Sequence, residues 1–187
     1  RSSAASDVYK RQVFEVRDDE KGFLQQAAKR VGVTLALSDQ SLTDQTLSLI
    51  QGSEGVSILG DSRMDEKLLA KLKDKGVKAL STRTIGFNHI DLAAAHRVGV
   101  RVAHASYPPN GVADFTVMLM LLTLRNYKPA MWRQNVNDYS LMGLRGRELR
   151  SLTGGVMGTG SIGRTVLQNL SGFGCRLLAY DKYQDAR

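Results

Sequence analysis

Three glycines and a distant aspartate near the carboxyl end of the chain have the spacing of a nucleotide-binding site. The segment Gly158-Thr159-Gly160-Ser161-Ile162-Gly163 has the pattern GxGxxG, and Asp181 follows the last glycine by eighteen residues. In this pattern the first glycine turns a strand sharply into a helix and the second lets the backbone approach a pyrophosphate. The third lets helix and strand pack closely. The pattern therefore predicts a site for the diphosphate of a dinucleotide.

The residues around this pattern are expected to form the strand, helix and second strand that the site needs. The helix is predicted over residues 161–173, and its unpaired N–H groups favour an anion at its beginning. A second strand over residues 175–180 would end at Asp181, whose carboxylate can accept the ribose hydroxyls of NAD but would repel the 2′-phosphate of NADP. We therefore predict NAD. The alternative is an ordinary strand–turn–helix connection, because glycine-rich turns are common.

Composition limits the class of protein. The chain has 187 residues, 42% of them hydrophobic and 24% charged, which is typical of a soluble globular protein. The net charge is +8, but the 26 basic residues are scattered among 18 acidic ones, so we expect no nucleic-acid partner. The longest apolar stretch, residues 117–122, is too short to span a membrane. The single Cys175 excludes an internal disulfide and predicts a buried thiol in a reducing, cytoplasmic setting.

The first half of the chain has the pattern of a parallel α/β domain. Residues 1–12 are polar, lack a hydrophobic period and are predicted to be a non-native leader outside the fold. Helical patterns such as residues 65–75 and 92–98 then alternate with short apolar runs. These runs predict strands over residues 13–16, 33–37, 55–58, 77–80 and 100–103. Such alternation predicts a parallel sheet covered by helices, with ligand-binding loops at the carboxyl ends of its strands.

One of these loops, residues 81–91, has features of an anion site. Gly86 would let the chain pass close to a ligand, and the neighbouring N–H groups could form a cradle beside a helix that begins near Asn88. A small carboxylate would fit such a cradle. The alternative is a simple strand–helix turn with Asn88 as the helix cap.

Three motifs in order resemble one enzyme family. They are TRTIGFNHID at residues 82–91, YPPNGVAD at residues 107–114 and GTGSIG at residues 158–163. Together they resemble the D-isomer-specific 2-hydroxyacid dehydrogenases, and within that family they are most similar to the D-lactate dehydrogenases, including the vancomycin-resistance branch. The resemblance covers residues 13–181.

The resemblance implies a fold and a set of site residues. The fold would be a flavodoxin-like parallel-sheet substrate domain over residues 13–108, followed by the start of a Rossmann domain over residues 109–187 that begins with a long helix at residues 110–126. The amides of Ile85 and Gly86 would hold the substrate carboxylate, and Tyr107 would approach it from the next loop. The cofactor NAD would be bound by Gly158, Gly160, Ser161, Ile162, Gly163 and Asp181.

The resemblance also implies what this chain does not contain. The family's arginine, glutamate and histidine, which polarise the carbonyl and supply the proton, would lie beyond Arg187, so we expect an amino-terminal fragment that is inactive alone. We do not expect His89, His96 or His104 to be the proton donor. Arg83 is expected to be exposed or salt-bridged rather than a substrate ligand. Packing or dimer contacts are expected for Met131, Trp132 and Tyr139.

The sequence therefore predicts an NAD-dependent D-2-hydroxyacid dehydrogenase that, when complete, reduces pyruvate to D-lactate as a homodimer without a metal. Two alternatives remain open at this point. One is a reductase of the same family that acts on another 2-oxo acid, such as hydroxypyruvate or phosphohydroxypyruvate. The other is an NAD-sensing binding protein on the same scaffold, similar to a corepressor.

Overall fold

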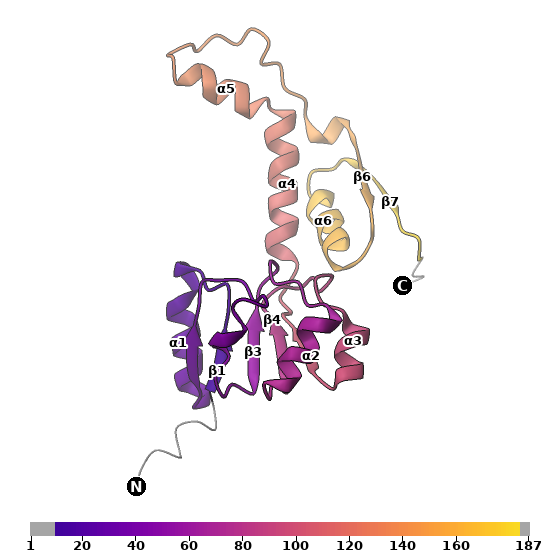
Figure 1. Ribbon diagram of the computed structural model, residues 1–187. Coiled ribbons are helices and arrows are strands. Elements are labelled where there is room, and N and C mark those ends of the chain that lie inside the picture. The colour runs from indigo at the N-terminus through magenta and orange to yellow at the C-terminus, as the bar shows by residue number, and fades with distance from the viewer. Residues whose placement is uncertain (1–9, 184–187) are drawn as a thin grey trace. The chain divides into compact units, whose positions relative to one another are not determined.

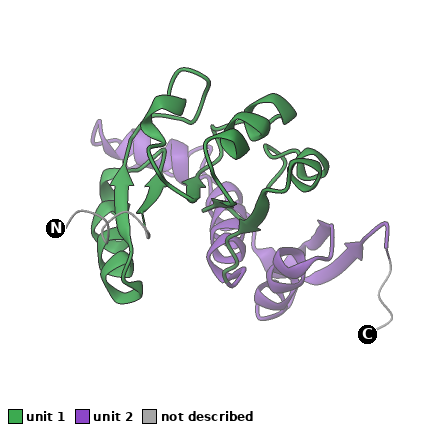
Figure 2. Ribbon diagram, turned by 60° about the horizontal axis from the view of Figure 1, so that its bottom comes forward, with its two compact units in different colours: residues 1–107 green, residues 108–187 purple. Residues whose placement is uncertain are grey.

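The computed structural model describes residues 10–183, which form two compact units (Figure 1). One unit extends to Tyr107 and the other begins at Pro108; Figure 2 colours them green and purple. Both units contain parallel strands joined by helices, so the predicted α/β class is confirmed. No helix among residues 10–183 is both long enough and apolar enough to cross a bilayer.

The first unit is a five-stranded parallel sheet with flavodoxin-like order, as predicted. The sheet has the order β2-β1-β3-β4-β5. Its strands are β1 (Lys10–Val13), β2 (Thr34–Leu37), β3 (Gly55–Ile58), β4 (Ala79–Thr82) and β5 (Arg101–His104). Its helices are α1 (Asp18–Val31), α2 (Glu66–Asp74) and α3 (Leu92–Val98), with a short 3₁₀ turn η1 at Leu47–Leu49. The strand order reverses between β1 and β3, and ligands of such sheets bind outside the carboxyl ends of the strands near that point.

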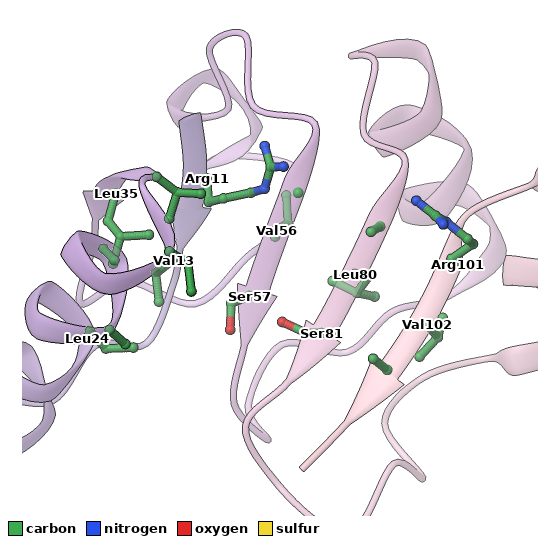
Figure 3. A pocket seen from close by; sticks show the side chains of 17 residues that line it. Arg11, Val13, Leu24, Leu35, Val56, Ser57, Leu80, Ser81, Arg101 and Val102 are labelled. Atoms are coloured by element: carbon green, nitrogen blue, oxygen red, sulfur yellow. The ribbon is translucent and has the colours of Figure 1, made fainter. Parts of the chain in front are cut away.

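The register of the strands separates the two faces of this sheet. Val56, Leu80 and Val102 are register partners on one face, where they pack in the core with α2 and α3. Ser57 and Ser81 are register partners on the opposite face, where α1 borders an apolar groove of about 530 Å³ (Figure 3). Helices therefore lie on both faces, which is the arrangement that a parallel sheet requires.

Three of the predicted strands begin too early, and the reason is the same each time. The predictions started at Val33, Val77 and Val100, whereas the strands start one, two and one residues later. Each valine follows a glycine with positive φ and donates its amide back to the preceding helix, for example Val77 N to Leu72 O at 3.0 Å and Val100 N to Ala95 O at 2.9 Å. These valines close helices through Schellman-type ends before they lead into strands.

The first strand was also predicted in the wrong place. It covers Lys10–Val13 rather than residues 13–16, so the exclusion of residues 1–12 from the fold is wrong for residues 10–12; residues 1–9 lie outside the described part. The strand ends early because Glu15 takes a φ of 56°. Few residues other than glycine adopt this left-handed backbone conformation. The buried Phe14 and Val16 therefore belong to a loop at the carboxyl edge of the sheet.

The second unit begins with helices and ends with a strand–helix–strand segment. Its helices are α4 (Asn110–Leu124), α5 (Tyr127–Gln134) and α6 (Ser161–Ser171), with a 3₁₀ turn η2 at Leu149–Ser151. The parallel strands β6 (Thr153–Met157) and β7 (Arg176–Tyr180) pair along their full length. In the core of this unit, Ala113 and Val117 of α4 pack against Val166 and Leu170 of α6.

Two details of the second unit correct the predictions. The helix predicted over residues 110–126 ends at Leu124, and a second helix starts after Asn126, whose φ of 51° breaks the helical path. Cys175, expected to be buried in a strand, precedes β7 and is only partly buried. Its thiol lies 3.7 Å from the carbonyl oxygen of Leu170, at the end of α6.

Candidate functional site

The glycine turn between β6 and α6 has the conformation that a dinucleotide loop needs. Gly158 has a φ of 94°, and its amide donates to the carbonyl of Tyr180 at 2.8 Å. This bond holds the start of the turn against the end of β7. A residue with a Cβ is strained at such a φ, so the first glycine of the pattern is required by the backbone itself.

The other two glycines have different surroundings. A Cβ added to Gly163 would lie 1.9 Å from the carbonyl oxygen of Gly158, so helix α6 packs against the turn at a distance that only glycine permits. A Cβ added to Gly160 would meet nothing within 4 Å. Space beside the second glycine is where the pattern predicts the approach of a pyrophosphate. The packing therefore explains Gly163, and the open space fits a ligand at Gly160.

The beginning of α6 presents unpaired amides beside that space. Arg164 has the first amide of this helix that bonds to a carbonyl, that of Gly160 at 3.0 Å. The amides of Ser161, Ile162 and Gly163 have no acceptor among the described residues. Helix α6 has eleven residues, so its dipole adds to the attraction for an anion. The residues present thus fit the diphosphate of NAD.

Asp181 lies at the end of β7 and is bonded to the glycine turn. Its Oδ2 accepts from the amide of Thr159 at 2.5 Å and from the hydroxyl of Thr159 at 3.1 Å, while Oδ1 accepts from the amide of Tyr183 at 3.1 Å. The backbone hydrogen bond from Thr159, followed by the other bonds to the carboxylate, lowers the pKa of Asp181 below its usual value. The carboxylate is therefore negatively charged at neutral pH and fixed beside the turn.

The loop after β4 has a row of open amides, but the helix that follows it begins later than the predicted start near Asn88. The Ile85 and Gly86 amides donate no hydrogen bond to any of the described residues. Residues 88–89 form a turn, and α3 begins only at Leu92, with Asp91 rather than Asn88 as its cap: Asp91 Oδ1 accepts from the Ala94 amide at 2.8 Å. A carboxylate at this loop would therefore be held by the loop amides without a helix dipole.

The next loop lies beside the first, because β4 and β5 are parallel neighbours. The Ala105 amide donates to the carbonyl of Thr84 at 3.1 Å, and the rings of Phe87 and His104 lie 5.4 Å apart. Tyr107 follows in this second loop, with 55% of its surface exposed. The structure thus brings the two predicted substrate loops to the same edge of the sheet, and it leaves the tyrosine accessible.

The polar contacts of Thr84 that support the first loop were not anticipated from the sequence. The hydroxyl of Thr84 donates to the Gly86 carbonyl at 2.7 Å and lies 2.6 Å from the hydroxyl of Thr82. Arg83 forms a largely buried ion pair with Glu20 at 2.9 Å, which agrees with the expectation of a salt-bridged arginine. A pattern of threonines in a loop is not specific, and Glu20 is too distant in sequence to be identified as a partner.

The comparison with known proteins extends over both units of the chain. A family model described as D-isomer specific 2-hydroxyacid dehydrogenase, catalytic domain, matches residues 11–178. The chain belongs to the D-isomer-specific 2-hydroxyacid dehydrogenases. This family consists of NAD-dependent oxidoreductases that act on a CH–OH group.

Individual members of the dehydrogenase family resemble the chain along nearly its whole length. It is 40% identical over 174 residues to an aromatic 2-oxoacid reductase of Clostridium sporogenes, covering 92% of this chain and 53% of the relative. The apo-structure of Escherichia coli D-lactate dehydrogenase has a TM-score of 0.84 at 36% identity, covering 95% of this chain and 56% of that one. The Aquifex aeolicus D-lactate dehydrogenase complexed with NAD and lactic acid has a TM-score of 0.82 at 29% identity, covering 94% and 52%. The chain thus spans about half the length of these dehydrogenases.

The three histidines of this dehydrogenase chain are not paired with acids. Within residues 10–183, none of them forms an ion pair with Asp or Glu. The Nε2 atom of His89 is buried without a partner, His96 is exposed on α3, and His104 lies against Phe87. A histidine that donates a proton to a developing alkoxide normally has an acid that orients it and raises its pKa. No histidine described here has that arrangement.

Proposed function

We propose that the protein is an NAD-dependent dehydrogenase that interconverts a small 2-oxo acid and its D-2-hydroxy acid, with pyruvate and D-lactate as the favoured pair. The observation that carries the proposal is the row of open amides at Ile85 and Gly86, on a chain whose glycine turn fits NAD. The likeness to the Escherichia coli D-lactate dehydrogenase, at 36% identity, supports pyruvate as substrate.

Each predicted site residue has a role in this proposal. The amides of Ile85 and Gly86 bind the substrate carboxylate, and Tyr107 contacts the substrate from the neighbouring loop. The pyrophosphate is held at Gly158, Gly160 and the three amides that begin α6, while Asp181 accepts the ribose hydroxyls. NAD, when bound, supplies or accepts the hydride. The chain's own contribution is to bind and orient both ligands.

A second candidate is a reductase for larger, aromatic 2-oxo acids. It is supported by the 40% identity to the aromatic 2-oxoacid reductase of Clostridium sporogenes. Both candidates use the same carboxylate loop and differ only in the group that follows the carbonyl carbon. Comparison of kcat/KM for pyruvate and phenylpyruvate distinguishes them, since the ratio of these values is the selectivity of the enzyme.

The carboxylate loop is tested by two substitutions at Gly86 in the protein expressed from its complete coding sequence. Gly86→Pro removes the amide hydrogen, whereas Gly86→Ala keeps it and places a Cβ that meets nothing within 4 Å. Because a hydrogen bond to a charged group is lost, we expect Gly86→Pro to raise the KM for pyruvate about tenfold or more. The KM for NADH should stay within about twofold for both variants. Equal KM values for pyruvate in the proline and alanine variants would contradict the proposed carboxylate site.

We also infer that these 187 residues do not supply the proton donor by themselves. The support is the absence of an acid beside any of the three histidines, all of which lie in the described part of the chain. The purified 187-residue polypeptide should therefore show no pyruvate-dependent oxidation of NADH above the rate without protein. The measurement is NADH absorbance over time, with intact mass confirmed. Clear turnover by this polypeptide would exclude the inference.

We further propose that the protein forms a homodimer through its second unit. The support is a set of apolar side chains on α4, on α5 and in the segment after α5 that are exposed in the single chain. Their exposed fractions include 61% for Trp132, 73% for Tyr139 and 57% for Phe115. Burial against a second copy would remove this surface from water, which favours the dimer-contact interpretation of these aromatic residues over internal packing.

A further inference from the structure

Arg83, the first residue after β4, has an unusually complete set of partners. Its guanidinium donates to Glu20 through Nε at 3.3 Å and Nη2 at 2.9 Å, and to Ser57 through Nη1 at 3.2 Å. Nη2 also donates to the carbonyls of Phe14 and Glu15, each at 3.0 Å. Three of these five contacts share the two N–H groups of Nη2, and one N–H group of Nη1 has no acceptor among the described residues. Four of the five N–H groups thus bond to the protein itself, so Arg83 chiefly links the segments that it holds.

The partners of Arg83 come from separate segments that meet at the carboxyl edge of the sheet. Phe14 and Glu15 follow β1, Ser57 lies on β3, and Glu20 is in the first turn of α1. The side chains of Arg83 and Glu20 are each only 16% exposed. Desolvation alone would raise the pKa of Glu20, but hydrogen bonds from Arg83 and the Arg17 amide, with the two positive charges, outweigh it and lower the pKa. The pair is therefore ionised and fixed.

Burial separates this pair from the other ion pairs of the chain. Every other pair among residues 10–183 has both side chains at least 32% exposed, and the similar Arg97–Glu66 pair between α3 and α2 is 55% and 59% exposed. A buried ion pair contributes little net stability, because desolvation offsets the attraction between its charges. It does define geometry, since each donor of an arginine has a fixed direction.

The loop that Arg83 begins is also anchored near Thr84 and at its far end, where the Met64 amide donates to the carbonyl of His89 at 2.8 Å. The hydroxyl of Thr84 donates to the Gly86 carbonyl at 2.7 Å and lies 2.6 Å from the hydroxyl of Thr82, which is also 3.4 Å from the carbonyl of Leu59. The Ala105 amide bonds to the carbonyl of Thr84 at 3.1 Å. The contacts near Thr84 hold that residue and the carbonyl side of the loop. The direction of the open Ile85 and Gly86 amides is then determined by these anchors together with Arg83.

We propose that Arg83, held by Glu20, is a positioning residue that aims the Ile85 and Gly86 amides at the substrate carboxylate. This role rests on the proposed function of that loop. It differs from direct binding, because four of the five N–H groups of the guanidinium bond to protein acceptors and the side chain is only 16% exposed. It also differs from a purely stabilising role, because a shift of the loop by about 1 Å weakens substrate binding strongly while leaving the nucleotide turn unchanged.

The test uses Arg83→Lys, with Arg97→Lys as the matched control, in the protein expressed from its complete coding sequence. Both changes keep the positive charge and remove a two-donor contact with a glutamate. Arg97, however, is on α3 and bonds to Glu66 of α2. We expect Arg83→Lys to raise the KM for the 2-oxo acid about tenfold, with the KM for NADH within about twofold of wild type. Arg97→Lys should leave both values within about twofold. Glu20→Gln should reproduce the effect of Arg83→Lys, and the double variant should add little to it, because coupled residues are not additive.

The outcomes separate this inference from the proposed function. If Arg83→Lys is folded and keeps the KM for the 2-oxo acid within twofold, while Gly86→Pro raises it, the inference is wrong and the carboxylate loop stands. If Gly86→Pro has no effect, the loop does not bind the carboxylate and both proposals fail. Equal increases in the KM for the 2-oxo acid and for NADH would indicate general disruption and would also overturn the positioning role. If Arg83→Lys does not fold, Glu20→Gln is used in its place, because it keeps the size of the side chain. The KM values for the 2-oxo acid and for NADH are then compared by the same criteria.

Discussion

Gly163→Ala is expected to destabilise the second unit by about 3 kcal/mol, which is at the upper end of the cost of forcing extra atoms into a packed site. The added Cβ would lie 1.9 Å from the carbonyl oxygen of Gly158, 3.0 Å from its carbonyl carbon and 3.2 Å from Cγ1 of Val156. Two of these three atoms belong to the backbone of the turn, so no side-chain rotation relieves the overlap. Helix α6 must move away from β6, which separates Val166 and Leu170 from the core of this unit.

The measurement is thermal unfolding followed by circular dichroism, together with titration of NAD. For a unit of this size, such a loss lowers the midpoint by on the order of 10 °C or more. NAD binding should be lost as well, because the displaced helix carries the amides of Ser161 and Ile162. An unchanged midpoint for Gly163→Ala would show that α6 does not pack against the Gly158 carbonyl closely enough to exclude a Cβ.

Gly160→Ala is the matched control for this substitution. The second glycine has a φ of −65° and a ψ of −169°, which any residue adopts, and its added Cβ would meet no atom within 4 Å. The midpoint should therefore stay within a few degrees of wild type. NAD should nevertheless bind more weakly, because the methyl group fills the space that the pyrophosphate approaches. The two variants thus distinguish Gly163, which the fold requires, from Gly160, which NAD binding requires.

The sequence predicted the turn between β6 and α6 well because its backbone leaves few choices of residue. Gly158 needs a positive φ and Gly163 needs close packing, so both requirements appear directly as residue types. Strand beginnings were less predictable. Val33, Val77 and Val100 have the apolar, branched side chains of strand residues, yet their amides bond back to the ends of helices. An apolar residue after a glycine serves either purpose, and only the backbone hydrogen bonds distinguish them.

Contacts between distant segments were beyond sequence reasoning. Arg83 was expected to be salt-bridged or exposed, but its partner Glu20 lies 63 residues earlier, on a helix that no motif connects to the loop. The left-handed Glu15 ended β1 early, although its residue type gives no sign of that conformation. Asn88 and Asp91 are both good helix caps, and the choice between them depends on the bridge between Met64 and Ile90, which fixes where α3 can begin. Tertiary contacts decided each of these cases.

Asp181→Asn is expected to remove the preference for NAD over NADP. The wild-type carboxylate is fixed by three hydrogen bonds from Thr159 and Tyr183, and it is charged because those bonds lower its pKa. Asparagine has nearly the same shape but no charge. The ribose hydroxyls of NAD then lose a charged acceptor, and the 2′-phosphate of NADP no longer meets a negative group. We expect the Kd for NADH to rise about tenfold and the Kd for NADPH to fall, which together change the ratio of the two by on the order of a hundredfold.

Thr159→Val provides the control for that experiment, since it removes one hydrogen bond to Asp181 but leaves the charge. The amide of residue 159 still donates to Oδ2, the contact that is 2.5 Å long in the wild type. The carboxylate therefore stays beside the turn, and the ratio of the Kd values for NADH and NADPH should change by less than about threefold. Fluorescence titration of both reduced cofactors measures the ratio for each variant. If Asp181→Asn keeps the wild-type ratio, the ribose is not held at the end of β7, and the discrimination between the two cofactors must come from residues outside this turn.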